Sequence, residues 1–91
     1  MPVTAQDIET ALRQALAPQQ LQVIDDSHHH AGHAGAGEGS HYTVRITCER
    51  FTGLRPVARH RLVYHALASL IPAGIHALAI QARSPGETET D

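Results

Sequence analysis

The stretch that decides the fold is HYTVRITCER, residues His41 to Arg50. Apolar side chains alternate along it with polar ones, which is the period of a β-strand with one face buried and the other in water. The buried face is predicted to carry Tyr42, Val44, Ile46 and Cys48. A sheet with only one apolar face must be covered by helices on that face, so the pattern predicts an α+β domain.

Two helices are predicted on either side of this strand. The first begins near Thr4, which together with Asp7 resembles a capping box, and it ends before Pro18. Its apolar stripe consists of Ile8, Leu12 and Leu16. The second starts with Pro56 in its first turn and is predicted to end at residues 72–74. Its predicted apolar arc consists of Val57, Val63, Ala66, Leu67, Leu70 and Ile71.

Two further strands complete the predicted order helix, strand, strand, helix, strand. They are Leu21–Asp26 and His76–Arg83, and the second places Leu78, Ile80 and Ala82 on one face. The first two strands are expected to pair antiparallel, whereas a strand, a crossover helix and a strand normally lie parallel. The starting ends of residues 41–50 and 76–83 then share one edge of the sheet. We therefore expect His76 to converge with the loop Ser27–Ser40.

Length and charge exclude several classes of protein. Ninety-one residues allow one domain, which excludes a two-domain enzyme. The formal charge of −2 with neutral histidines does not favour strong nucleic-acid binding. Protonation of all eight histidines would reverse the sign of this charge. Cys48 is the one cysteine, so neither an intrachain disulfide nor a four-thiolate zinc site is possible. No nucleophile elbow or placed carboxylate pair favours hydrolysis, and we expect no enzyme activity.

The chain is expected to be cytoplasmic and without membrane contact. Its first residues carry neither the basic run nor the apolar core of a signal peptide, and no later segment is long and apolar enough for a membrane span. The single cysteine is consistent with a reducing compartment.

The candidate metal ligands are histidines. His28, His29, His30 and His33 lie in a Gly- and Ala-rich loop, with His41 just beyond it. Such a run is compatible with a solvated loop that binds metals weakly, and its expected convergence with His76 favours a site that a partner completes. His76 is also compatible with a structural histidine at the rim of the core. It is two residues before Leu78, and in a regular strand both would therefore lie on the same face.

Arginines cluster around the start of the second helix. Five of the seven lie between Arg45 and Arg61. Such a cluster can contact phosphates or an acidic partner, and it is equally compatible with a solvated helix face.

Five blocks of this sequence together resemble the BolA family. They are DSHHH (26–30), HYTV (41–44), RFTG (50–53), RHRLVY (59–64) and IHALAI (75–80), and the resemblance runs from about residue 5 to residue 87. It implies an α+β fold similar to class II KH domains, a three-stranded mixed sheet with helices packed on one face. Residues 1–86 would form a single BolA-like domain and residues 87–91 a flexible acidic tail, with fraying expected from Ser84 onward.

The resemblance also implies a function. BolA-like proteins partner monothiol glutaredoxins and share with them, and with glutathione, a 2Fe-2S cluster in iron-sulfur trafficking. His76 matches the family's ligand histidine, and the second ligand comes from the loop, where His30 and His33 remain alternatives. The chain would be a monomer alone and a heterodimer with its partner.

An alternative role implied by the family is regulation of transcription by DNA binding. The residues that would contact DNA are Arg55, Arg59, His60 and Arg61, near the start of the second helix. Nucleic-acid-binding KH domains carry a GxxG clamp between two helices. The one such spacing here, Gly32 to Gly35, falls in the histidine-rich loop instead, which weakens the alternative.

Overall fold

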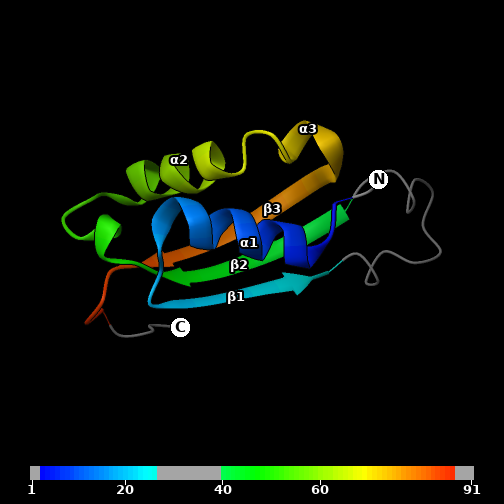
Figure 1. The fold of residues 1–91 in the computed structure, drawn as a ribbon. Helices are drawn as coiled ribbons and strands as arrows, with labels where there is room; N and C mark the ends of the chain where they lie inside the picture. The colour runs from blue at the N-terminus through cyan, green and yellow to red at the C-terminus, as the bar shows by residue number, and fades with distance from the viewer. Residues whose placement is uncertain (1–2, 27–39, 88–91) are drawn as a thin grey trace.

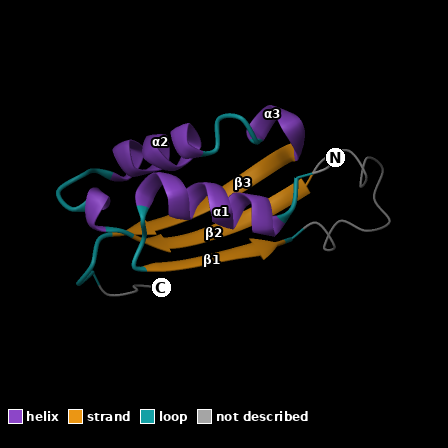
Figure 2. Ribbon diagram, in the orientation of Figure 1, coloured by secondary structure: helices purple, strands orange, loops and turns teal. Residues whose placement is uncertain are grey.

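The computed structural model describes residues 3–26 and 40–87 of the chain. These residues form α1 (Ala5–Leu16), β1 (Gln20–Asp25), β2 (Ser40–Thr47), α2 (Pro56–Ala66), α3 (Ile71–Gly74) and β3 (Ile75–Arg83), with a 3-10 turn at Glu49–Phe51. All three helices lie on one side of a single sheet (Figures 1 and 2). No helix in the described ranges is long and apolar enough to cross a membrane.

The sheet has the predicted mixed topology. Its order is β1-β2-β3, with β1 antiparallel and β3 parallel to the central strand β2. The chain between β2 and β3 contains both α2 and α3, which cross over the face that α1 also covers (Figure 1). The expected α+β architecture, a three-stranded mixed sheet with helices on one face, is confirmed.

Helix α1 begins at the predicted capping box. The backbone N–H of Asp7 donates to the Thr4 hydroxyl at 3.1 Å, and the Thr4 N–H donates to the Asp7 carboxylate at 3.0 Å. These two bonds satisfy donors that the first turn of a helix leaves without partners. The helix ends at Ala17, whose φ of 47° is left-handed and turns the chain toward β1 ahead of Pro18.

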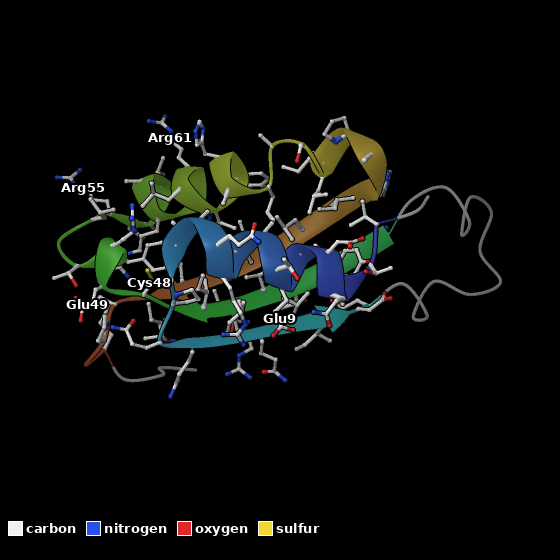
Figure 3. The ribbon with its side chains drawn as sticks, in the orientation of Figure 1. Glu9, Cys48, Glu49, Arg55 and Arg61 are labelled. Carbon is white, nitrogen blue, oxygen red and sulfur yellow. The ribbon has the colours of Figure 1, made fainter. Side chains whose placement is uncertain are left out.

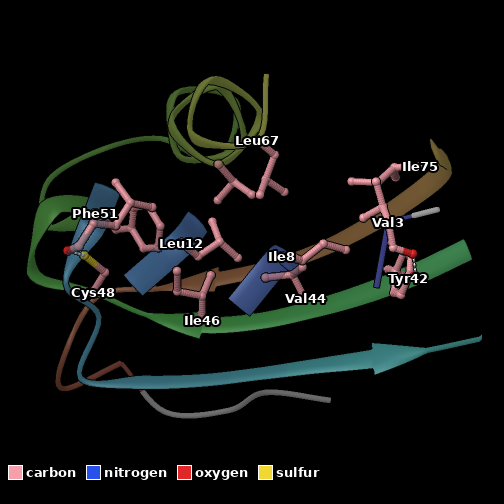
Figure 4. Packing of buried hydrophobic residues seen from close by; sticks show 12 residues of the cluster. Val3, Ile8, Leu12, Tyr42, Val44, Ile46, Cys48, Phe51, Leu67 and Ile75 are labelled. Carbon is pink, nitrogen blue, oxygen red and sulfur yellow. Dashed lines mark hydrogen bonds between the residues drawn. The ribbon is translucent and has the colours of Figure 1, made fainter. Parts of the chain in front are cut away.

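The core lies between the helices and the covered face of β2 (Figure 4). All four residues predicted for the buried face of the central strand are buried, and so is the whole predicted stripe of α1. The strand itself ends at Thr47, and Cys48 follows as an extended residue whose Sγ–H donates to the Leu16 carbonyl at 3.1 Å. At the other end of the core, the Tyr42 hydroxyl donates to the Val3 carbonyl at 2.9 Å.

The second helix differs from its prediction. It ends at Ala66, and α3 begins separately at Ile71 with Pro72 in its first turn, where the missing proline N–H has no partner to lose. Val63 and Leu67 are buried as expected, but Val57 is 63% exposed. At about 100° per residue, Val57 lies about 240° around the helix from Val63, so both cannot face one core. The predicted apolar arc was wrong for Val57.

Replacing Leu12 with alanine is expected to lower the free energy of unfolding by about 2–5 kcal/mol. Leu12 is fully buried between α1 and the sheet, and removing its isobutyl group loses apolar burial and leaves a cavity. Urea denaturation at neutral pH would measure the loss. Gln14→Ala, at an exposed position of the same helix, is the matched control with an expected change within about 0.5 kcal/mol. Equal effects of the two substitutions would contradict the assigned packing.

Candidate functional site

A pair of histidines lies where β2 and β3 begin. His41 is the second residue of β2 and His76 the second residue of β3. Because the two strands are parallel, their first residues lie at the same edge of the sheet (Figure 1). The two imidazole centroids are 5.1 Å apart, with 36° between the ring planes. The structure thus brings together two side chains from distant parts of the sequence.

A β-bulge sets the direction of His76. Ser40 pairs with Ile75 and His41 pairs with Ala77, so β3 advances two residues where β2 advances one. The extra residue breaks the alternation of the strand, as bulges do. Ile75 is consequently buried, whereas His76 is exposed beside His41. The alternative of a structural histidine at the core rim, drawn from its shared parity with Leu78, was wrong because of this bulge.

The same edge carries a shallow hollow of about 290 Å³. It is lined by Asp26, His41, Tyr42, Ala77, Leu78 and Ala79. The Asp26 N–H donates to the His41 carbonyl at 2.8 Å, and the Asp26 carboxylate accepts a bond from the Thr43 hydroxyl. These bonds hold the backbone of His41 in place where β1 ends and β2 begins.

The predicted loop ligands, His30 and His33, lie outside the described residues. The described chain stops at Asp26 and resumes at Ser40, next to the histidine pair. His41 was noted beside the loop histidines in the sequence but was not assigned as a ligand. The parallel strand starts did predict convergence with His76, but the bulge that turns His76 toward His41 has no signature in the sequence.

The histidine pair alone does not make a complete metal site. Within residues 3–26 and 40–87 there is no group of three or more His, Cys, Asp or Glu side chains that could hold a metal ion. Two imidazoles at an exposed edge can supply part of a coordination sphere, and any further ligands must come from elsewhere.

The predicted nucleic-acid residues divide into two groups. Arg55, the N-cap of α2, is exposed, and so are His60 and Arg61 within the helix. The side chains of Arg55 and Arg61 extend away from the body of the protein (Figure 3). The Arg59 side chain is only 12% exposed. Its guanidinium donates to the carbonyls of Leu54 and Ala82 and to the Glu87 carboxylate, the last at 2.7 Å. Arg59 is therefore a bridge within the protein and not part of a solvated basic face.

Glu87 fastens the end of the described chain. The Arg59 guanidinium, together with the backbone N–H and the hydroxyl of Ser84, lowers the pKa of Glu87 from 4.5 to about 2. Ser84 is itself buried. The prediction that the chain frays from Ser84 onward was thus wrong for residues 84–87, because an arginine on α2 holds them.

Glu87→Gln is expected to destabilise the fold in a pH-dependent way. A lowered folded-state pKa stabilises the protein above the unfolded value of 4.5, and this contribution is lost as the pH falls toward about 2. Melting temperatures of wild type and variant should therefore differ most near neutral pH and converge near pH 2. A difference that stays constant across this range would contradict an ionised Glu87 bound to Arg59.

The fold and the histidine-bearing strand edge define a small α+β domain with a mixed three-stranded sheet. The family model described as BolA-like protein matches residues 12–87. The chain belongs to the BolA family.

Individual relatives agree with this assignment. The chain is 45% identical over 84 residues to an uncharacterised Sinorhizobium protein encoded in the cobS 5′ region, covering 88% of this chain and 89% of the relative. It is 48% identical over 73 residues to the Vibrio cholerae protein named DNA-binding transcriptional regulator BolA, and the match covers 80% of this chain and 67% of the relative. The structure of BolA1 from Arabidopsis thaliana superimposes with a TM-score of 0.81 at 37% identity, and the match covers 98% of this chain and 99% of that one. The chain spans about half the length of several eukaryotic relatives.

Proposed function

We propose that this protein is a non-enzymatic, cytoplasmic partner of a monothiol glutaredoxin, with which it shares a 2Fe-2S cluster in iron-sulfur trafficking or iron regulation. The observation that carries the proposal is the pair of neighbouring imidazoles, His41 and His76, at an exposed strand edge. The glutaredoxin and glutathione come from the family resemblance. The isolated chain would be a monomer and the complex a heterodimer.

The donor set fits a shared cluster. Imidazole ligates iron in Rieske-type 2Fe-2S centres, where two histidines replace two cysteines on one iron. The described residues offer two neighbouring imidazoles and no third ligand, as expected of a site whose remaining ligands come from a partner. The exposure of His76 leaves room for that partner to approach.

His76 is the first ligand in this proposal, and three histidines compete for the role of the second. His30 and His33 follow from the family pattern in the loop. His41 is favoured by its position, because strand pairing and the Asp26 N–H fix its backbone beside His76. A ligand on a fixed strand end loses less conformational entropy on binding than one on a long loop.

Reconstitution with a monothiol glutaredoxin and glutathione under anaerobic conditions tests the proposal. Absorption and circular dichroism of the wild-type mixture are expected to differ from the spectra of the glutaredoxin alone with its cluster. His76→Ala should abolish the difference, and one of His41→Ala, His30→Ala and His33→Ala should alter it and so identify the second ligand.

His65→Ala is the matched control, because His65 is exposed on α2 away from the strand edge. It should leave the heterodimer spectrum unchanged. A wild-type mixture that shows only the glutaredoxin spectrum, or a heterodimer spectrum indifferent to His76→Ala, would refute the proposed cluster role.

DNA binding is the second candidate, favoured by the exposed cations of α2 and by the name of the Vibrio relative. Arg55 and Arg61 would contact phosphates, whereas Arg59 is held by Glu87. Each phosphate contact contributes close to one unit to the slope of log affinity against log salt concentration. The double variant Arg55→Gln/Arg61→Gln is expected to reduce that slope by about two, measured by fluorescence anisotropy on a DNA duplex. An unchanged slope would exclude this face.

A further inference from the structure

The outer side of α2 carries apolar side chains that no described part of the chain covers. Val63 faces the core and is buried, whereas Val57 is 63% and Tyr64 43% exposed. Within residues 3–26 and 40–87, these two are the only large hydrophobic residues that are exposed, and both lie on this one helix. A helix with apolar residues on opposite sides is normally packed on both. The described residues pack against one side, so the outer side is a candidate surface for another molecule.

Helix geometry places the exposed residues of α2 on one stripe. At about 100° per residue, Tyr64 lies about 20° around the axis from Val57, and Arg61 lies about 40° from Val57 on the other side. His60, at about 60°, completes this outer stripe, and all four residues are exposed. The Arg61 side chain extends away from the body of the protein (Figure 3). The outer stripe therefore faces away from the sheet.

The outer stripe also carries positive charge without a neighbouring acid. Among the described residues, the side chains of Arg55, at the N-cap, and Arg61 have no ion pair and no hydrogen bond. Arg59 differs from both, because Glu87 binds it. The sequence between Glu49 and Glu87 contains no acidic residue, and the first turn of α2 therefore has none. The complement to this surface is a molecule with both carboxylates and apolar side chains.

The apolar residues favour a protein over a nucleic acid as that molecule. Contacts to the phosphate backbone are made by cations and polar groups, so Val57 and Tyr64 gain little from them. Tyrosine and arginine are enriched among the residues that contribute most to protein–protein binding. The formal charge of −2 with neutral histidines also disfavours binding of the whole chain to a polyanion.

We propose that the outer stripe of α2 docks an acidic amphipathic helix of another protein. The apolar side of that helix packs on Val57 and Tyr64, and its carboxylates lie against Arg55 and Arg61. The successive spacings of four and three residues from Val57 to Arg61 to Tyr64 are those at which helices pack against each other. This docking goes beyond the proposed cluster role and is independent of it, because the outer stripe shares no residue with the histidine pair.

Titration of the ¹⁵N-labelled full chain with a synthetic helical peptide tests the proposal. The peptide carries leucine along one face and glutamate and alanine on the other. Saturable amide shifts are expected around Val57, Arg61 and Tyr64. A second peptide, with glutamine in place of each leucine, keeps the charge and should bind at least about tenfold more weakly, because the apolar contacts are lost.

Three variants locate the binding surface. Tyr64→Ala should weaken binding of the leucine peptide about tenfold, as expected of a central aromatic contact. Val57→Thr keeps the shape of the side chain and should weaken binding about fourfold, the effect of losing one apolar group. Arg61→Gln should weaken binding at low salt and have less effect at physiological salt, because exposed charges are screened.

Arg13→Gln is the matched control for charge. It removes an exposed arginine on α1, which is paired with Glu9 at 2.9 Å, and should leave the affinity for the leucine peptide unchanged. His76→Ala should also leave it unchanged, which separates this proposal from the cluster role. If Tyr64→Ala fails to give a folded spectrum, Val57→Thr decides the outcome.

Three results would overturn the proposal. The first is the absence of saturable shifts with the leucine peptide, or equal weakening by Arg13→Gln. The second is tighter binding of a DNA duplex that Tyr64→Ala leaves unchanged, which would assign the helix to nucleic acid. The third is a dimer of the chain alone, detected by sedimentation equilibrium and weakened by Tyr64→Ala, which would assign the outer stripe to a second copy.

Discussion

The parallel pairing of β2 with β3 is the constraint on which the rest of the structure depends. Parallel neighbours cannot be joined by a tight turn, so the chain from Cys48 to Gly74 must cross the sheet, and α2 and α3 form that crossover. The same pairing brings the first residues of both strands to one edge. His41 and His76 are neighbours for this topological reason.

The core limits where chemistry can occur. The covered face of β2 and the facing stripe of α1 are filled by aliphatic side chains, Tyr42 and Cys48. These side chains are apolar or engaged in hydrogen bonds within the core. The polar side chains that could bind a ligand therefore lie outside the core. They are the histidines at one end of the sheet, the arginines on its open face and the cations on the outer side of the helix layer.

The strand alternation predicted the sheet well, because a period of two residues places every side chain once the strand is identified. The regular pattern of HYTVRITCER assigned Tyr42, Val44, Ile46 and Cys48 correctly to the core. The second helix was harder to predict, since a helix face depends on the angle summed over many residues. Val57 shows the error. It is apolar, but around the helix axis it does not point in the direction of the buried Val63.

The sequence predicted where the candidate site lies, at the edge of the sheet, but not how its side chains are oriented. Topology predicts that His76 meets the end of the loop, but the direction of its side chain depends on one extra residue in β3 opposite His41. Arg59 shows the same limit. Its charge and its neighbours Arg55 and Arg61 suggest a solvated basic face, but the Ala82 carbonyl and the Glu87 carboxylate hold its guanidinium against the protein. Contacts of this kind join residues far apart in sequence, so local pattern cannot reveal them.

Charge is also segregated along the chain, with a consequence for how its surfaces act. No acidic residue lies between Glu49 and Glu87, and Glu87 compensates one arginine of that segment, Arg59. The exposed cations Arg55 and Arg61 lie on the helix layer, whereas Arg83 is the last residue of β3 in the sheet. Exposed charges are screened over about 8–10 Å at physiological salt. The charge of Arg55 and Arg61 therefore acts on a partner that contacts the helix layer directly, and its effect on more distant molecules is screened.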